Sequence, residues 1–525
     1  MPQQNTNKNE KEKVNMKRTI ALMLAVLMLV GLFTGCGKQE ASAPEQESSS
    51  SQETGKPAET PAEPEKEEEE IVTLKLVTRV GSFPDQDMVQ EEINKILREK
   101  IGVEIELGFI GLGEYDQNVK TMMAGGDDID IVFTSNFAND YYSAVAQGAF
   151  MPLDDLLAEY APQSYANIPE KFWDAVRVDG KIYGFINYQI IASQTGLMYR
   201  KDLVDEFGFD VDAVKKIEDV EPYLAAAKAK DPSIIPMEMS KTGIFTYLET
   251  YYGFDQIGND YMPGAVRFGE DSLTVENIFA SEEFAEYCAL MRDWYQKGYF
   301  IADAATFTSV ADQRKTGRIA AAINPIKPGV EAEITVNYAN DMGVVALTEP
   351  FATTTGCTNT MNAIMATCEH PEKAMQFLEL LNTDVELNNL LNFGIEGVHY
   401  NKISDNQIEL IPDSGYCPNR AWTFGTAFLS YYLPGQATDI WDLTKKMNEE
   451  SVAAPTLGFT FDPANVQSEI AQCASVYEEF GPSLITGTVD PEEILPQFLA
   501  KLETAGASKI IAEEQAQIDA WLAAK

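Results

Sequence analysis

The chain has 525 residues and carries 82 acidic against 39 basic side chains, so its formal net charge at pH 7 is −43. This charge repels nucleic acid and anionic membrane surfaces, so we expect no nucleic-acid partner and favour neutral or cationic solutes as ligands. The length exceeds what one hydrophobic core usually supports, and two lobes are therefore predicted.

The first predicted element is an apolar segment that ends at Cys36. Lys17 and Arg18 precede residues 19–33, which are almost purely apolar. This stretch is too short to span a bilayer comfortably, but it suits the central region of a signal peptide. Together with the sequence LFTGC at 32–36, it resembles a bacterial lipoprotein signal that is cut before Cys36, which then carries lipid. A plain secretion signal, an uncleaved anchor and a start at Met16 stay open.

Residues 37–70 form a predicted acidic tether. They are rich in Glu, Ser, Pro and Ala and contain no aromatic residue and no Ile, Leu, Val or Met. Such a segment cannot bury enough apolar surface to fold, so we expect it to be disordered. The protein is then held by its lipid anchor at the extracellular face of the cell membrane, and the organism is expected to be Gram-positive.

Strands and helices alternate in the next part of the chain. The apolar pattern predicts strands at 72–77, 103–107 and 129–133 and helices at 88–100 and 115–123. This alternation predicts an α/β fold with mostly parallel sheets flanked by helices. Ligands of such sheets bind beyond the carboxyl ends of the strands, which points to the loops at 79–85 and 134–137.

Several later stretches resemble one family in their order along the chain. They are AGGDDIDIV at 124–132, GAFMPLDDL at 148–156, DGKIYGF at 179–185, GLMYRKDL at 196–203, FGIEGVHY at 393–400, WTFG at 422–425, GFTFD at 458–462 and GTVDP at 487–491. In this order they resemble extracellular solute-binding lipoproteins of carbohydrate ABC importers, in the branch of large proteins associated with polysaccharide fragments. Asp128, where a proline is common, and Thr426, where the branch often has Asn, depart from the pattern.

The resemblance implies a two-lobed, periplasmic-binding-protein-like fold with several hinge crossings. We expect residues 71–190 with 345–405 in the first lobe and residues 191–344 with 406–525 in the second. The implied function is capture of an oligosaccharide between the lobes and its delivery to the transmembrane subunits of an ABC permease. We expect a monomer that is not an enzyme and needs no cofactor.

Sugar binding requires aromatic rings for the apolar sugar faces and polar groups for the hydroxyls. Trp422 is the first candidate, because it lies in the WTFG stretch beside Gly425; the alternative is a tryptophan that packs the hinge. The other candidates are Arg79, Asp85, Asn136, Tyr188, Glu396 and His399. Arg79 and Asp85 could instead pair with each other, and Glu396 and His399 could brace the hinge.

The remaining four tryptophans are weaker candidates for contact with the ligand. Trp294 is expected in the core, and Trp441 and Trp521 in the packed faces of helices, whereas Trp173 is expected near a lobe rim.

Two other functions stay open at this point. A secreted glycoside hydrolase needs only two carboxylates, and acids are abundant; a surface adhesin would usually show internal repeats, and none is found. The GxSxG, HExxH and GxxxxGK[ST] motifs are absent. The only histidines are His370 and His399, so no histidine-based metal site is expected, while bound calcium stays open. The sequence does not select a disulfide among Cys288, Cys357, Cys368, Cys417 and Cys473.

Overall fold

The computed structural model describes residues 71–270 and 272–524. Residues Glu68–Lys525 form one compact unit. The predicted signal segment, the tether and Cys36 lie outside the described residues. Within the described ranges, no helix combines the length and the apolar character that crossing a membrane requires.

The first lobe is built on a five-stranded sheet with the strand order β2-β1-β3-β15-β6. Its strands are β1 (Val72–Thr78), β2 (Val103–Phe109), β3 (Ile131–Thr134), β6 (Phe185–Ile186) and β15 (Met361–Ile364). β1 pairs in parallel with β2 and β3, but β15 pairs antiparallel with β3 and β6.

The second lobe contains a four-stranded sheet with the order β13-β7-β12-β8 and a three-stranded sheet with the order β11-β10-β9. Their strands are β7 (Gln194–Arg200), β8 (Ile235–Met237), β12 (Ile319–Ile326) and β13 (Met342–Ala346), and β9 (Phe254–Gln256), β10 (Gly264–Arg267) and β11 (Glu276–Asn277). β7 pairs antiparallel with β12 and β13, and only β8 runs parallel to β12.

The sheets are therefore mixed, whereas the alternation of strands and helices had predicted mostly parallel ones. Parallel neighbours arise from crossover helices within one lobe. β15 and β7 each enter their sheet from the other lobe, so no such crossover sets their direction.

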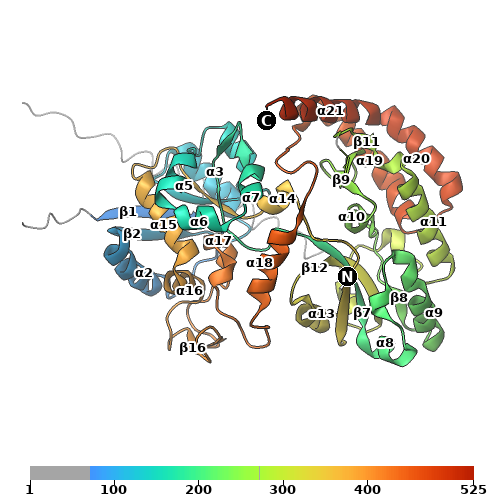
Figure 1. Cartoon of the computed structure of the whole chain (residues 1–525), viewed down its shortest axis with the longest axis horizontal. Coiled ribbons are helices and arrows are strands. Elements are labelled where there is room, and N and C mark those ends of the chain that lie inside the picture. The colour runs from blue at the N-terminus through green and yellow to red at the C-terminus, as the bar shows by residue number, and fades with distance from the viewer. Residues whose placement is uncertain (1–70, 271, 525) are drawn as a thin grey trace, which may run out of the picture. The chain divides into compact units, whose positions relative to one another are not determined.

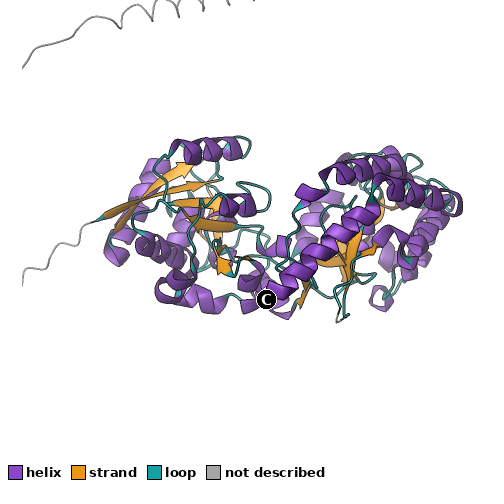
Figure 2. Cartoon of the chain, turned by 90° about the horizontal axis from the view of Figure 1, so that it is seen from above, coloured by secondary structure: helices purple, strands orange, loops and turns teal. Residues whose placement is uncertain are grey.

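Helices lie on both sides of each main sheet (Figures 1 and 2). Those of the first lobe are α2 (Gln86–Ile101), α3 (Tyr115–Gly125), α4 (Tyr141–Ala146), α5 (Asp154–Tyr160), α6 (Pro162–Asn167), α7 (Glu170–Ala175), α14 (Thr354–Cys357), α15 (Pro371–Thr383), α16 (Val385–Phe393), α17 (Ala421–Phe424) and α18 (Ile440–Glu450). Those of the second lobe are α8 (Lys201–Phe207), α9 (Glu221–Lys230), α10 (Phe245–Leu248), α11 (Glu282–Gln296), α12 (Ala311–Arg314), α13 (Val330–Tyr338), α19 (Gln467–Ile485), α20 (Pro491–Ala505) and α21 (Ala507–Ala524). Short strand pairs complete the fold: β4 (Arg177–Val178) with β5 (Lys181–Ile182), β14 (Phe351–Ala352) with β18 (Val452–Ala453), and β16 (Tyr400–Lys402) with β17 (Ile408–Leu410).

Local sequence explains the ends of the first helices. Val89, Ile93 and Leu97 place the apolar face of α2 in the core. α2 ends at Gly102 and α3 ends at Gly126, and both glycines have positive φ angles, 65° and 71°. A residue without Cβ adopts this left-handed conformation at little cost, which is why glycine so often ends helices.

The buried apolar residues form one large cluster in each lobe. The first surrounds β1, β3 and β15, and the second surrounds α9, α11 and β12. Trp294 is fully buried in the second cluster, as expected. Trp173, expected near a rim, is also a core residue, with 1% of its surface exposed.

The segment that follows residue 405 packs on the first lobe, whereas it was expected in the second. Tyr416 and Phe424 belong to the core of the first lobe, and Thr78 of β1 donates a hydrogen bond to the carbonyl of Thr423 (3.3 Å). Asn448 of α18 also bonds to the backbone at 189–192. Residues 406–450 therefore extend the first lobe, and the last crossing to the second lobe follows α18.

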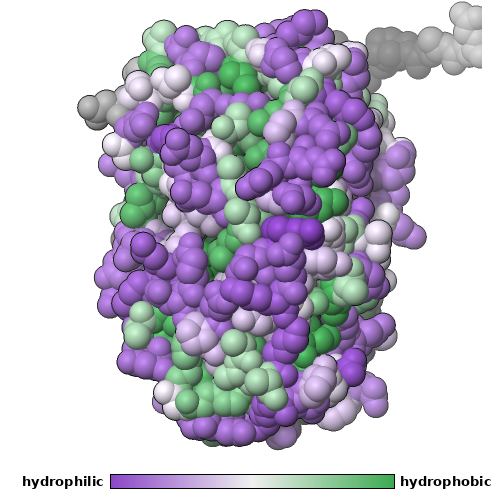
Figure 3. All heavy atoms as spheres, turned by 90° about the vertical axis from the view of Figure 1, so that its right-hand side faces the viewer, coloured by the Kyte–Doolittle hydropathy of each residue, from purple (hydrophilic) through white to green (hydrophobic). Residues whose placement is uncertain are grey.

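The surface shows no unusual apolar concentration on the face drawn in Figure 3. Hydrophilic side chains predominate there, and apolar ones lie between them in small groups. Such a mixture is ordinary for a protein surface in contact with water.

Candidate functional site

A cavity of about 860 Å³ lies between residues of the two lobes. One wall consists of Lys327 and the side of α13 that carries Glu331 and Val336, and the opposite wall carries Trp422 and Trp441. A neighbouring cavity of about 390 Å³ shares Ile190, Lys327 and Glu333 with it. We call the two together the cleft.

Trp422 is held firmly at the wall of the first lobe. Its half-buried ring lies 5.9 Å from the ring of Phe133 in an edge-on arrangement, and the guanidinium of Arg420 lies 5.7 Å from its centroid. Its carbonyl accepts a hydrogen bond from Asn187 (2.9 Å). Trp422 thus packs the end of β3 and also lines the cleft.

Gly425, which follows the Trp422 stretch, was expected to let the backbone approach a ligand, but it has a packing role. A Cβ at this position would lie 2.8 Å from the carbonyl oxygen of Leu381. The glycine therefore allows close packing of α17 against α15 and does not open a path for a ligand.

Trp441 is a second tryptophan in the cleft, whereas its place in a helical segment predicts a packing role. Its indole N–H donates to the carbonyl of Ser430 (2.9 Å), and its ring stacks on Tyr432 at 6.2 Å with an interplanar angle of 23°. These contacts fix the ring while leaving it half-exposed. Its position at the start of α18 gave no signal that it lines the cleft.

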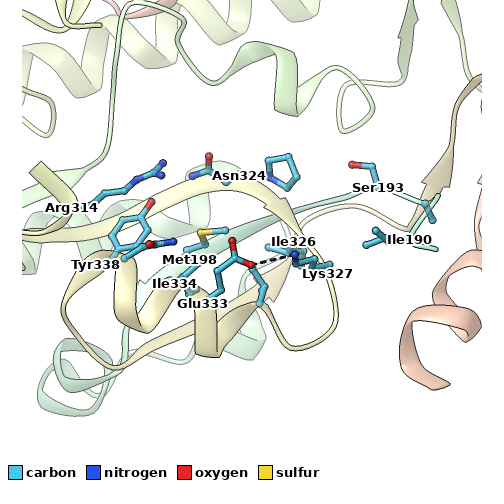
Figure 4. Close-up of a pocket in the computed structure, with 14 residues that line it drawn as sticks. Ile190, Ser193, Met198, Arg314, Asn324, Ile326, Lys327, Glu333, Ile334 and Tyr338 are labelled. Atoms are coloured by element: carbon cyan, nitrogen blue, oxygen red, sulfur yellow. Dashed lines mark ion pairs between the residues drawn. The ribbon is translucent and has the colours of Figure 1, made fainter. Parts of the chain in front are cut away.

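Charged groups lie along the smaller cavity (Figure 4). Arg314 forms two hydrogen bonds with the carboxylate of Glu238 (2.7 and 2.6 Å), which also accepts one from Tyr338 (3.0 Å). Glu238 holds the pKa of the Arg314 guanidinium above its usual value, and burial raises the pKa of Tyr338. Lys327 pairs with Glu333 at 3.2 Å, marked by the dashed line.

Two other predicted site residues lie near the ends of the first strands. The Arg79 guanidinium lies 5.3 Å from the ring centroid of Phe137, and its Nε is buried without a hydrogen-bond partner among the described residues. Asn136 donates to the carbonyl of Thr355 (3.0 Å) and lines a different cavity from Trp422. The structure thus does not gather these residues into one site.

Asp85 bonds to His399, not to Arg79. His399 Nδ1 accepts a hydrogen bond from the backbone N–H of Ile395 (2.9 Å), so in the neutral ring Nε2 carries the proton and donates to Asp85 (3.3 Å). His399 is fully buried, and a Cβ on Gly394 would overlap its ring. The histidine therefore braces the turn after α16 and does not reach the cleft.

The last two predicted residues also lie away from the cleft. Glu396 is exposed and pairs with Lys402 (3.3 Å). Tyr188 is 4% exposed, and its ring packs edge-on against Phe428 at 4.8 Å. The five cysteines of the described ranges are free, and four of them are buried.

Comparison with protein families identifies the fold. The model of the bacterial extracellular solute-binding proteins matches residues 82–386. The chain belongs to this family of solute-binding proteins. A second model, a domain of unknown function (DUF3502), matches residues 455–523 of this solute-binding protein.

Individual relatives agree with the family assignment. A Streptococcus pneumoniae serotype 4 protein described as a carbohydrate ABC transporter substrate-binding protein is 28% identical over 453 residues, which cover 85% of this chain and 90% of that protein. The crystal structure of an N-glycan transport solute-binding protein (NgtS) from S. pneumoniae superposes with a TM-score of 0.73 at 24% identity, covering 86% and 99% of the two chains. The same protein in complex with Man5GlcNAc gives a TM-score of 0.57 at 26% identity, with the same coverage. The two-lobed α/β fold predicted from the sequence is thereby confirmed.

Proposed function

We propose that this solute-binding protein captures an oligosaccharide in the cleft and delivers it, chemically unchanged, to the transmembrane subunits of an ABC importer. The observation that carries the proposal is the pair Trp422 and Trp441 on one wall of an 860 Å³ cavity. The ligand class is supported by the relatives, which include a carbohydrate-binding importer component and complexes with Man1GlcNAc and Man5GlcNAc.

The cleft has the composition that a saccharide requires. A pyranose ring presents an apolar face, which an aromatic ring covers, and a rim of hydroxyls, which amides and charged groups satisfy. Gln189, Asn419 and Glu331 line the same cavity as the two tryptophans. The volume lies in the range of about 300–1,000 Å³ that is common for small-molecule sites.

Ligand binding would shift the population toward a form in which the lobes are closer together. Such a shift brings α13, in the second lobe, toward Trp422 and Trp441, in the first. We retain Arg79 as a candidate contact in the liganded form, since it lies at the carboxyl end of β1. Asn136, which lines a different cavity, is not retained as a contact in the cleft. Asp85, Tyr188, Glu396 and His399 act as positioning residues in this proposal.

The family is extracellular, and we propose that lipid on Cys36 anchors this member to the outer face of a Gram-positive cell membrane. The protein would act there as a monomer. Replacement of Cys36 by Ser in the full chain should abolish metabolic labelling by a fatty-acid analogue, whereas Cys417→Ser should leave it intact. Labelling that persists in Cys36→Ser would contradict the anchor.

The function is tested by titrating Man1GlcNAc and Man5GlcNAc into the compact unit Glu68–Lys525 in a calorimeter and recovering the sugar for mass spectrometry. We expect saturable binding and an unchanged sugar mass. Cleaved sugar would support a glycoside hydrolase, and absence of binding across a broad panel of neutral glycans would support an adhesin; either result refutes the proposal.

A further inference from the structure

A second cavity, of about 830 Å³, shares none of its lining residues with the cleft. It is lined by residues of the first lobe, by the region from α10 to Met262 in the second lobe, and by the segment from Thr456 to Ala474. Part of its wall thus comes from the segment matched by the domain of unknown function. We call it the acidic cavity.

The charged residues that line the acidic cavity are all carboxylates: Asp140, Glu249 and Asp255. No Lys, Arg or His belongs to the lining. Asp140 caps α4 by accepting a hydrogen bond from the N–H of Ser143 (2.9 Å), so it has a structural role. Among the residues that the structure describes, neither of the other two carboxylates forms an ion pair.

Asp255 is 9% exposed, and only one of its two carboxylate oxygens accepts hydrogen bonds from the described residues. Oδ2 accepts hydrogen bonds from the N–H (2.9 Å) and the hydroxyl (2.6 Å) of Thr456. Oδ1 has no hydrogen-bond partner within the part of the chain that the structure describes. Asp255 lines the cavity, so its second carboxylate oxygen is available to accept a hydrogen bond from a ligand.

Glu249 is the other of these two acids. Its carboxylate has no ion pair or hydrogen bond among residues 71–270 and 272–524. Burial, together with the nearby charges of Asp260 and Asp255, raises the pKa of this carboxyl well above its usual value. A cation bound near Glu249 would offset the nearby charges of Asp260 and Asp255.

The remaining wall is rich in aromatic rings, which attract cations through their faces. They are Tyr142, Tyr261, Phe351, Phe459 and Phe461, whereas Phe254 beside them is fully buried. Phe254 already has a cation on its face: the guanidinium of Arg267, which is paired with Glu283, lies 4.4 Å from its centroid.

We infer that the acidic cavity is a second ligand site, and that it binds an organic ammonium group. Glu249 and Oδ1 of Asp255 accept hydrogen bonds from the ammonium group, and the rings cover the carbon atoms next to the nitrogen. A bare metal ion fits less well, since metal ions prefer several converging oxygen ligands. Among the described residues, no group of three or more His, Cys, Asp or Glu side chains is placed to hold one.

The test uses the compact unit Glu68–Lys525 and three probes: choline, putrescine and glucosamine. N-acetylglucosamine, which lacks the cationic amine, is the matched control ligand. We expect saturable binding of at least one probe by calorimetry, and N-acetylglucosamine should not displace that probe. Binding should weaken at least tenfold in Glu249→Gln and Asp255→Asn, and it should be unchanged in Glu99→Gln, which removes an exposed charge on α2.

Tyr261→Leu provides a second line of evidence, because it removes a lining ring but keeps both carboxylates. This substitution should weaken binding of the same probe if the aromatic wall contacts it. Circular dichroism confirms that each variant is folded. Absence of binding for all three probes, or equal affinity in Glu249→Gln, would overturn the inference.

The test of ammonium binding can be told apart from the test of glycan binding in the cleft. Trp422→Ala should leave ammonium binding intact, and saturation with Man5GlcNAc should not displace the probe. Displacement by the glycan would place the ammonium site in the cleft and would also overturn the inference.

Discussion

The buried carboxyl group of Glu514 in α21 should make the free energy of unfolding depend on pH. Its side chain is fully buried, and neither carboxylate oxygen has a hydrogen-bond partner among the described residues. Burial raises the pKa of its carboxyl to about 8. Gly264 of β10 packs directly against it, and a Cβ on this glycine would overlap the carboxylate.

The sign of the pH dependence follows from this pKa. Between the ordinary pKa of 4.5 and about 8, the folded protein keeps the Glu514 proton while the unfolded chain has lost it. The free energy of unfolding therefore falls as pH rises through this window, and it becomes independent of this group above pH 8. A window of about 3.5 pH units at about 1.4 kcal/mol per unit gives a total of roughly 5 kcal/mol.

Glu514→Gln should remove this component, since the amide has a similar shape and does not titrate. Urea unfolding of Glu68–Lys525 at pH 5, 6, 7 and 8 should show a shallower fall in unfolding free energy for the variant than for the unchanged protein. Glu513→Gln is the neighbouring control, because the pKa of Glu513 is lowered by bonds from Gln517 and Asn465 and it does not titrate in this range.

Gly264 supplies an independent check of the packing. Gly264→Ala should be strongly destabilising, and adding Glu514→Ala should restore much of the loss because it removes the overlapping carboxylate. Parallel pH profiles for the unchanged protein and Glu514→Gln would refute the assigned environment of Glu514. So would strictly additive effects of the two alanine substitutions.

Three further predictions concern the cleft and the hinge. Trp422→Ala and Trp441→Ala should each weaken glycan binding about tenfold, which corresponds to about 1.4 kcal/mol of stacking, as measured by calorimetry; unchanged Kd values in folded variants would contradict the aromatic wall. Asn448→Ala should lower the free energy of unfolding by about 3 kcal/mol. The substitution leaves the backbone N–H groups of residues 191 and 192 and the carbonyl of residue 189 unpaired. A loss below about 1 kcal/mol in urea unfolding would refute this. Gly329→Ala should hinder approach of the lobes, because φ is 74° and a Cβ would lie 2.6 Å from Ile440; small-angle scattering that shows the same glycan-induced compaction as the unchanged protein would argue against it.

The sequence determined the local elements and the class of protein well. The periodicity of Val89, Ile93 and Leu97 and the glycines at 102 and 126 define α2 and α3 through contacts within a few residues, so a sequence pattern captures them. The ordered family stretches identified a two-lobed solute-binding fold, which the comparisons confirm. Among the candidate ligand contacts, Trp422 does line the cleft.

The tertiary structure alone decided which side chains meet. Asp85 and His399 are 314 positions apart, and their hydrogen bond depends on how the turn after α16 returns to the end of the first strand. Trp441 has the sequence pattern of a residue packed in a helix, yet it is half-buried and lines the cleft. The mixed strand directions and the placement of 406–450 in the first lobe have the same origin. They are set by contacts between segments distant in sequence, which leave no periodicity in the sequence itself.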